Sequence, residues 1–365
     1  GTQNTAVGAF TLDSNTTAND NTAVGGSALG QNTTGASNTA LGRSALTANT
    51  TAANNTAMGY NAGTAVTTGA NNTIIGATAG DALTVGNSNT AVGQNALSLD
   101  TKGDINTAIG IGALQSQNFT STTDSYNTAV GGFAGGSNTT GQANTFVGGL
   151  AGNNNTTGEK NVALGYQALT TNVAGDQAVA IGHEALKVAN PSGNANLNDT
   201  AVGFQAGLAC TTGSKNVFIG SSTGYNLTTG STSIYVGYNS TASAVNITNE
   251  IVIGSNAAGG GTNTARFQTT GGSATLGLDG SDTSWAAASD SRLKKDVASS
   301  TVGLNFIKDL RPVTFKWNAK NAVANSLPQY DADSSDPVFG EGKAHHGFIA
   351  QEVKTVIDAH SDVVD

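Results

Sequence analysis

The sequence is poor in the residues that build most globular cores and binding sites. Of its 365 residues, 5% are aromatic, 11% are charged, four are proline and only Cys210 is cysteine. Large side chains supply most of the burial in an ordinary enzyme, so the composition argues against such a core. One cysteine excludes an intrachain disulfide and a multi-cysteine metal site. Disordered chains are usually rich in charge and proline, so simple disorder is disfavoured as well.

The charge and the lack of long apolar runs exclude several classes of partner. The net charge is −9 and Lys/Arg clusters are absent, which argues against binding to nucleic acid or to an anionic membrane surface. No run of about 18 apolar residues occurs, so we expect no membrane insertion. The sequence begins inside a repeat and without a secretory signal, so we expect a further N-terminal part in the full protein.

A short motif of the type Asn-Thr-Ala-Val-Gly recurs from Asn4 to Gly254. Its glycine occurs 15 times, and 12 of the 14 intervals between successive glycines have the spacing i, i+17 that separates Gly8 from Gly25. The intervals 110–131 and 182–203 have the spacing i, i+21, so each contains a four-residue insertion. A repeat of this length is too short for a strand and a crossover helix. We therefore predict a mainly β fold, a β-solenoid (β-roll) over residues 1–258 whose coils stack about 4.8 Å apart.

Alternation along the strand suggests which side chains share a face. In Thr22-Ala23-Val24 the first and third side chains share one face and Ala23 takes the other. We place the aliphatic residue before each glycine inside, in a thin column of Val, Ile and Leu. The alanine face could then pack against copies of itself, and because the column is a small core for one chain, we predict a homotrimer. Phe146, Phe218 and Tyr235 replace alanine in some coils, where we expect that face to widen or to meet solvent.

Three other interpretations of the repeat are weaker. A threonine ladder on a flat solenoid face can bind ice, but Thr22, Thr39 and Thr56 share their face with the aliphatic residues, and we expect them inside. Calcium-binding nonapeptide repeats need a Gly-Gly-x-Gly-x-Asp run, which is absent. Asn-x-Thr sequons such as Asn32-Thr33-Thr34 follow from the repeat and need not mean glycosylation.

The repeat resembles the heads of trimeric autotransporter adhesins. Coils of that family carry a motif of the type Asn-Ser-x-Ala-Ile-Gly in left-handed β-rolls, and the Asn-Thr-Ala-Val-Gly copies match this pattern. The usual repeat of the family is shorter than the one in this chain, so the shape of the coil can differ. The resemblance covers about two-thirds of the chain and implies a solenoid.

A change in composition marks a domain boundary near residue 289. Residues 1–288 carry 13 acidic and 6 basic residues, whereas the much shorter segment 289–365 carries 11 acidic and 9 basic residues. Residues 259–288 lose the period of the repeat, and 264–267 and 274–278 are predicted as short strands of a β-stem connector. We therefore predict three parts: a shaft over 1–258, a connector over 259–288 and a small α+β domain over 289–365.

The last segment has its own pattern of elements. A helix capped at residues 299–301 is predicted to run through Leu310 and to stop before Pro312. Residues 313–317 alternate as a strand, 321–342 are predicted as a loop, and a second helix is predicted near 350–359.

Three motifs in this segment carry a second resemblance. They are Ser289-Asp290-Ser291-Arg292-Leu293-Lys294-Lys295-Asp296, Leu310-Arg311-Pro312-Val313-Thr314-Phe315-Lys316-Trp317 and His346-Gly347-Phe348-Ile349-Ala350-Gln351-Glu352-Val353. In order and spacing they resemble the intramolecular chaperone domain of endosialidase-type phage tail spikes and fibres. The resemblance implies a domain that helps three chains to assemble and then releases itself by autoproteolysis. That family usually continues into long C-terminal helices, whereas this sequence stops at Asp365, so a truncated domain is among our expectations.

The resemblance further implies a serine–lysine dyad, Ser289 and Lys294, with cleavage between Ser289 and Asp290. A serine hydroxyl is a weak nucleophile until a base takes its proton, and lysine can be that base only if burial or nearby positive charge, such as Arg292, lowers its pKa. Attack by Ser289 on its own carbonyl would form a strained four-membered ring, so the nucleophile could come from a neighbouring subunit, or the strain could be relieved otherwise. The alternative is that Ser-Asp-x-Arg-x-Lys is a polar helix entry without chemistry.

No cofactor or metal ion is expected. His345 and His346 are adjacent, and in a strand they would point in opposite directions, so they could not easily share an ion with Glu352. We expect His346 to have a supporting, structural part, and Cys210 to be a small residue near a turn.

The sequence as a whole predicts a structural, host-attachment fibre of a phage tail, located on the virion. Its partners would be two further copies of the chain, other virion tail proteins and a host cell-surface receptor, either a glycan or a protein. The alternatives are a bacterial trimeric surface adhesin and a structural filament protein with the same chaperone domain. No polymer-degrading site is evident, because the carboxylates of the repeat are scattered rather than paired.

Overall fold

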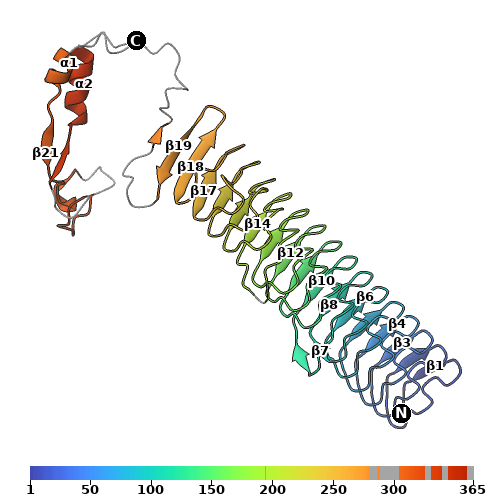
Figure 1. The fold of residues 1–365 in the computed structure, drawn as a ribbon. Coiled ribbons are helices and arrows are strands. Elements are labelled where there is room, and N and C mark those ends of the chain that lie inside the picture. The colour runs from blue at the N-terminus through green and yellow to red at the C-terminus, as the bar shows by residue number, and fades with distance from the viewer. Residues whose placement is uncertain (194, 279–285, 288–303, 325–329, 339–343, 360–365) are drawn as a thin grey trace. The chain divides into compact units, whose positions relative to one another are not determined.

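The computed structural model describes residues 1–193, 195–278, 286–287, 304–324, 330–338 and 344–359 (Figure 1). The chain divides into two compact units, Gly1–Ala288 and Ser289–Asp365. The first is mainly β and consists of a solenoid followed by a hairpin, and the second is small and contains both helices and strands, as predicted.

The solenoid is a stack of three-residue strands, one in each coil. Its main strands are β1 (Thr5–Val7), β2 (Thr22–Val24), β3 (Thr39–Leu41), β4 (Thr56–Met58), β5 (Thr73–Ile75), β6 (Thr90–Val92), β8 (Thr107–Ile109), β10 (Thr128–Val130), β11 (Thr145–Val147), β12 (Val162–Leu164), β13 (Val179–Ile181), β14 (Thr200–Val202), β15 (Val217–Ile219), β16 (Ile234–Val236) and β17 (Glu250–Ile253). Each pairs in parallel with the next, so that Ala23 of β2 lies beside Ala40 of β3. Residues that are one repeat apart in the sequence therefore lie side by side in neighbouring coils of the solenoid.

A glycine follows each strand because the chain turns there against the backbone of the next coil. Gly25 has φ +134°, and a Cβ on it would lie 2.5 Å from the carbonyl oxygen of Gly42. Any side chain is therefore excluded both by conformation and by space. Gly35, ten residues further on, has no positive φ, contrary to the usual expectation for a turn glycine. A Cβ there would instead clash with the carbonyl oxygen of Ala52.

The strands face the opposite way from our prediction. Ala23 is fully buried, whereas Val24 is only half-buried and Thr22 is exposed. The interior of each coil consists of this middle residue together with the alanine and leucine that follow the glycine, as in Ala28 and Leu29. The strand period shows which residues share a face, but it does not say which face is inside.

Large middle residues are accommodated by glycines rather than by widening the face. Phe146, Phe218 and Tyr235 are all fully buried, so the prediction that they meet solvent is wrong. Phe146 fills space beside Gly135 and Gly152, at the position where other coils carry a buried leucine. The volume lost at one position of the coil is thus recovered at another, which keeps the interior close-packed.

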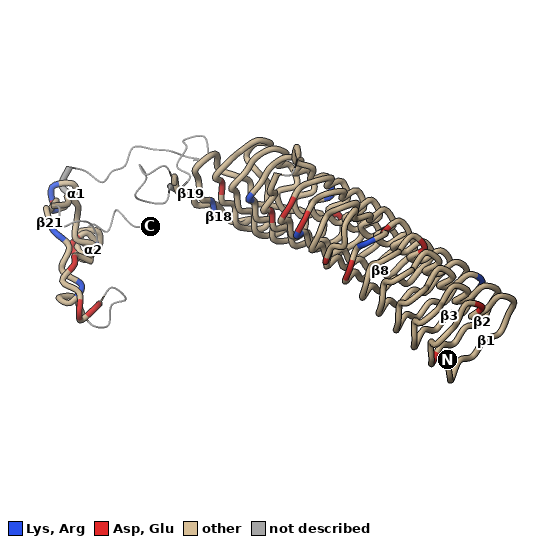
Figure 2. Tube along the Cα trace, turned by 90° about the horizontal axis from the view of Figure 1, so that it is seen from below, with Lys and Arg blue, Asp and Glu red and all other residues tan. Residues whose placement is uncertain are grey.

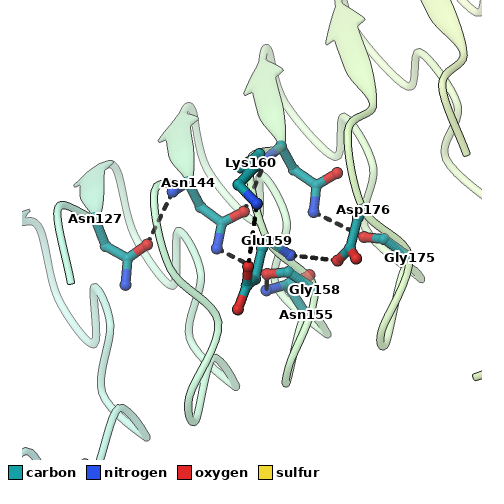
Figure 3. Close-up of polar contacts among 9 residues, drawn as sticks. Asn127, Asn144, Asn155, Gly158, Glu159, Lys160, Gly175 and Asp176 are labelled. Carbon is teal, nitrogen blue, oxygen red and sulfur yellow. Dashed lines mark hydrogen bonds and ion pairs between the residues drawn. The ribbon is translucent and has the colours of Figure 1, made fainter. Parts of the chain in front are cut away.

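Buried asparagines form a ladder that joins the coils. The side-chain Oδ1 of Asn127 accepts a hydrogen bond of 2.9 Å from the backbone N–H of Asn144 in the next coil (Figure 3). The Nδ2 of Asn144 donates to the carbonyl oxygen of Gly158 at 2.9 Å. The same two bonds recur from coil to coil, for instance at Asn38. The ladder pairs interior backbone groups whose loss would cost about 1–3 kcal/mol each.

The two four-residue insertions lie at one corner of the coil and leave the strands in register. Around the first, β7 (Gly103–Asp104) pairs in parallel with β9 (Thr123–Asp124), beside the stack of main strands in Figure 1. Around the second, Asp176 bridges to Asn196. The main strands on either side still pair residue for residue, as in Val179 with Thr200. Residues can therefore be inserted at this corner of the coil without changing the strand register or the interior.

A hairpin closes the first unit in the region predicted as a β-stem. Strand β18 (Thr264–Thr269) pairs in parallel with β17 and antiparallel with β19 (Gly272–Gly277), which pairs with β20 (Ala286–Ala287). Glu250, in the asparagine position of the last coil, accepts hydrogen bonds from the Tyr235 hydroxyl at 3.0 Å and from the Gly261 N–H at 2.9 Å. This carboxylate joins the end of the ladder to the hairpin.

The second unit contains α1 (Leu304–Asp309), β21 (Val313–Phe315), the 3₁₀ turn η2 (Lys320–Ala322), β22 (His345–Gly347) and α2 (Ala350–Ala359). The strand predicted from residue 313 and the helix predicted near 350–359 are both present. The first predicted helix is described as α1, and its predicted cap at residues 299–301 lies outside the described residues.

The exchange of volume between Phe146 and its flanking glycines can be tested by mutation. We expect Phe146→Ala to lower the free energy of unfolding by about 3–5 kcal/mol, because it leaves a cavity in the core. Adding Gly135→Leu and Gly152→Leu should recover part of that loss, since Leu29 has the same left-handed backbone, with φ 49°. Urea denaturation would measure both effects. Equal stability of the single and triple variants would contradict the packing rule.

The stability of the solenoid is expected to depend on pH through Asp199, which replaces an asparagine of the ladder. Burial raises the pKa of Asp199 from 3.8 to about 7, although the N–H of Asn216 donates to its Oδ1 at 2.7 Å. The folded chain therefore holds a proton that the unfolded chain releases above about pH 4, and this stabilisation is lost as the pH rises through about 7. The loss amounts to at most about 4 kcal/mol.

The matched variant is Asp199→Asn, which restores the amide found at this position in most other coils. We expect it to unfold at higher urea concentration than the parent protein at pH 8 and to have a flatter stability profile between pH 4 and 8. Asn161→Asp should create a second pH-sensitive position. Identical pH profiles of the parent and Asp199→Asn proteins would contradict the assignment.

Candidate functional site

The residues predicted to carry the cleavage are not described by the structure. Ser289, Asp290, Arg292 and Lys294 all lie within 288–303, outside the described residues. Their geometry therefore remains a prediction, and the observable part of the candidate site consists of the two later motifs.

Strands β21 and β22 bring the second and third motifs together. They pair antiparallel, with Val313 opposite Gly347, Thr314 opposite His346 and Phe315 opposite His345. The two motifs are separated by the segment predicted as a loop, so only the fold brings them side by side.

An ion pair joins the same two motifs a second time. The Nε of Arg311, just before β21, donates to Oε2 of Glu352 in the first turn of α2 at 3.0 Å, and Nη2 donates to Oε1. This two-pronged geometry fixes orientation as well as proximity. The hydrogen bonds from Arg311 hold the pKa of the Glu352 carboxyl below its ordinary value. Because both side chains are exposed, the pair contributes more to the orientation of α2 than to stability.

An aromatic cluster lies at the end of the strand pair, and it involves His345 rather than His346. The ring of Phe315 lies 5.2 Å from that of Trp317 and 5.7 Å from that of His345, measured between centroids. The Nε2 of His345 is buried without a hydrogen-bond partner in the described chain. His346 is exposed on the other side of β22, as its alternate position in the strand requires. The supporting part expected for His346 stays a prediction.

Among residues 306–324, 330–338 and 344–359 of the second unit, none is buried. Its large apolar side chains remain open to solvent, including Ile307 at 60%, Phe348 at 52% and Trp317 at 40% exposure. The free energy of burying apolar surface is the main driving force of folding. Within a single chain, the described residues of this unit bury little apolar surface and so gain little of this free energy.

The outward face of the solenoid strands is also apolar. The residue before each glycine is aliphatic in all 15 coils and is buried in none of them. We call these residues the aliphatic row: Val7, Val24, Leu41, Met58, Ile75, Val92, Ile109, Val130, Val147, Leu164, Ile181, Val202, Ile219, Val236 and Ile253. The row is the part of the shaft that the sequence placed in the core, so its exposure corrects our prediction.

The threonines of the strands lie on this outward face too. Our argument against ice binding relied on Thr22, Thr39 and Thr56 pointing inwards, and that argument is wrong, because Thr22 is exposed and the other two are half-buried. The threonine ladder therefore lies beside the aliphatic row at the surface.

The described residues offer few other candidates for a site. Charged residues are scattered along the shaft, as Figure 2 shows. Within the described ranges, no three His, Cys, Asp or Glu side chains come together as a possible metal site. None of the helices in those ranges is both long and apolar enough to cross a bilayer.

Two features of the candidate site were not predicted from the sequence: the Arg311–Glu352 ion pair and the exposure of the aliphatic row. Arg311 and Glu352 both stood in the quoted motifs, and their opposite charges were the available signal for a pairing. For the aliphatic row no comparable signal was available, because alternation along the strand is the same whichever face is inside.

One comparison with known proteins finds a similarity over the second unit. Residues 289–362 match the family described as "Chaperone of endosialidase", Peptidase_S74. The match covers about a fifth of the chain and indicates an autoproteolytic chaperone domain behind a long β-solenoid. A search of the curated proteins found no match, and a search of the solved structures found none.

The Arg311–Glu352 pair is expected to hold α2 against β21. Arg311→Glu places two carboxylates side by side, so we expect faster amide hydrogen exchange in α2, measured by mass spectrometry. Exchanging both charges, Arg311→Glu with Glu352→Arg, should restore slow exchange. Lys316→Glu, at an exposed lysine of the same segment, is the control and should have little effect. Unchanged exchange in Arg311→Glu would rule out the orienting role.

Proposed function

We propose that this protein is a homotrimeric, host-attachment fibre of a phage tail, whose C-terminal domain chaperones trimer assembly and then cleaves itself off. The observation that carries this proposal is the family match over 289–362 at the end of a long, uniform solenoid. The fibre would be part of the virion, bound to other tail proteins at one end and to a host receptor along the shaft.

The lack of burial in the second unit supports assembly by several chains. A chain of this size usually needs a core of its own, or a partner that supplies one. Exposed side chains such as Ile307 and Phe348 could find that core on two further copies of the same domain. Trimerisation would then begin at the C-terminal domain.

The uniformity of the shaft explains why an assembly domain would be needed. Successive coils present nearly the same outward residues, so three shafts could pair with a slip of one coil at little cost in energy. The unusual interior residues, such as Phe146 and Tyr235, are buried and cannot report the slip to a neighbouring chain. A domain that brings three C-termini together sets the register before the shafts pack.

The second candidate is a bacterial trimeric surface adhesin, favoured by the likeness of the repeat to the heads of autotransporter adhesins. A structural filament with the same chaperone domain is a further alternative. The neighbouring genes separate these possibilities: tail genes favour the fibre, and a membrane-anchor region in the full gene favours the adhesin.

Cleavage would follow the chemistry of a serine–lysine dyad. Lys294 accepts the proton of the Ser289 hydroxyl, whose oxygen attacks the carbonyl carbon of residue 289 in a neighbouring subunit. The bond from that carbon to the nitrogen of residue 290 breaks, the proton held by Lys294 passes to the released amine, and water then hydrolyses the ester. A subunit-to-subunit attack avoids the four-membered ring and makes cleavage depend on trimer assembly. Because lysine must be uncharged to act as a base, the rate should rise with pH.

We expect Ser289→Ala to abolish the release of a fragment that begins at Asp290, followed by intact mass over time. Lys294→Arg keeps the positive charge but cannot act as a base, so it should be equally inactive. Ser291→Ala, two residues away, is the matched control and should still be cut. Cleavage at the 289–290 bond in Ser289→Ala protein would reject the dyad.

A further inference from the structure

We infer that the outward strand face of the solenoid, formed by the aliphatic row and the threonine ladder beside it, is the surface through which three shafts pack against one another in parallel. This inference rests on the proposed trimer and names the surface of the shaft that takes part in it. The sequence pointed to the alanine face instead, but alanines such as Ala23 and Ala40 are fully buried inside their own coil.

Exposure along the row is much greater than a monomer needs. Val7 is 56% exposed, Leu164 44% and Met58 43%, although each coil offers polar residues such as Thr and Asn at other surface positions. Solitary soluble proteins rarely expose a continuous apolar patch larger than a few hundred Å². A row that stays aliphatic over 15 coils is therefore covered in the assembled protein.

The size of the face suits a subunit interface. Three strand residues extend about 10 Å and 15 coils stack to about 70 Å, which gives a strip of roughly 700 Å² per chain. This is close to the roughly 800 Å² that one chain contributes to a stable pairwise interface, and in a trimer each chain divides it between two neighbours. The half-exposed threonines beside the row widen the strip slightly and can pair with one another across the interface.

A second copy fits this face better than another kind of partner. No charged residue occurs at either outward strand position of any coil, so nothing on it recognises a charged ligand. The face is flat and repeats every coil, and the surface that best matches such a repeat is an identical one in register. Ice is the main competitor, because a flat array of threonines could bind it as well.

Cysteine cross-linking of the full chain tests the inference. Leu41→Cys lies on the row, and Thr51→Cys is its control at an exposed corner of the next turn. The native Cys210 is fully buried and should not react. With a short bismaleimide, we expect Leu41→Cys protein to give at least tenfold more cross-linked chain on a denaturing gel than Thr51→Cys protein. Light scattering on the same samples gives the mass of the assembly.

The outcomes separate the inference from the proposed function. A trimer mass with cross-links through position 41 supports both. A trimer mass with equal or greater cross-linking through position 51 overturns the inference and leaves the trimer in place. A monomer mass overturns both, and thermal hysteresis of such a monomer would assign the face to ice.

Charge substitutions provide a second measurement that does not rely on cross-linking. Leu41→Glu with Met58→Glu should lower the melting temperature of the assembled shaft strongly, because carboxylates would be buried at the interface. Thr51→Glu with Thr68→Glu, at exposed corners, should leave it within a few degrees of the parent. Equal melting temperatures of the two double variants would overturn the inference.

Discussion

The structure depends on the exact repetition of backbone hydrogen bonds from coil to coil. Each strand pairs with the strand one repeat later, and the corner glycines let the backbones of neighbouring coils come into contact. The buried asparagines form hydrogen bonds both to the next strand and to the turn before it. These contacts need small and hydrogen-bonding residues rather than large ones. The unusual composition of the chain follows from this constraint.

An interior made of alanine, leucine and amide ladders is complete within one chain. The aliphatic residues at the end of each strand are therefore not used to fold the coil and are left at the surface. The C-terminal unit has the opposite problem, because its described residues form elements without a buried centre. In the proposed trimer, association of identical chains would cover the outward face of the solenoid and supply a buried centre to the C-terminal unit.

The two units differ in the kind of contact that holds them together, and this difference suits them to different roles. The shaft is held by regular pairing between successive coils, so its surface is uniform, and a uniform surface does not by itself set a register between chains. The C-terminal unit has a specific geometry, fixed by the strand pair β21–β22 and by the Arg311–Glu352 ion pair. In the proposed trimer, such a domain would set a register between the shafts that remains after cleavage.

Much of this could be predicted from the sequence alone: the period of the repeat, the number of coils, the change of character near residue 289 and the three motifs of the chaperone domain. These depend on residues close together along the chain or on exact spacing. The orientation of the strands could not be predicted, because alternation is the same whichever face is inside. Only the tertiary structure decided it, through the direction in which residues such as Ala28 and Leu29 point after the corner glycine. The pairing of Arg311 with Glu352 likewise depended on a fold that joins segments 41 residues apart.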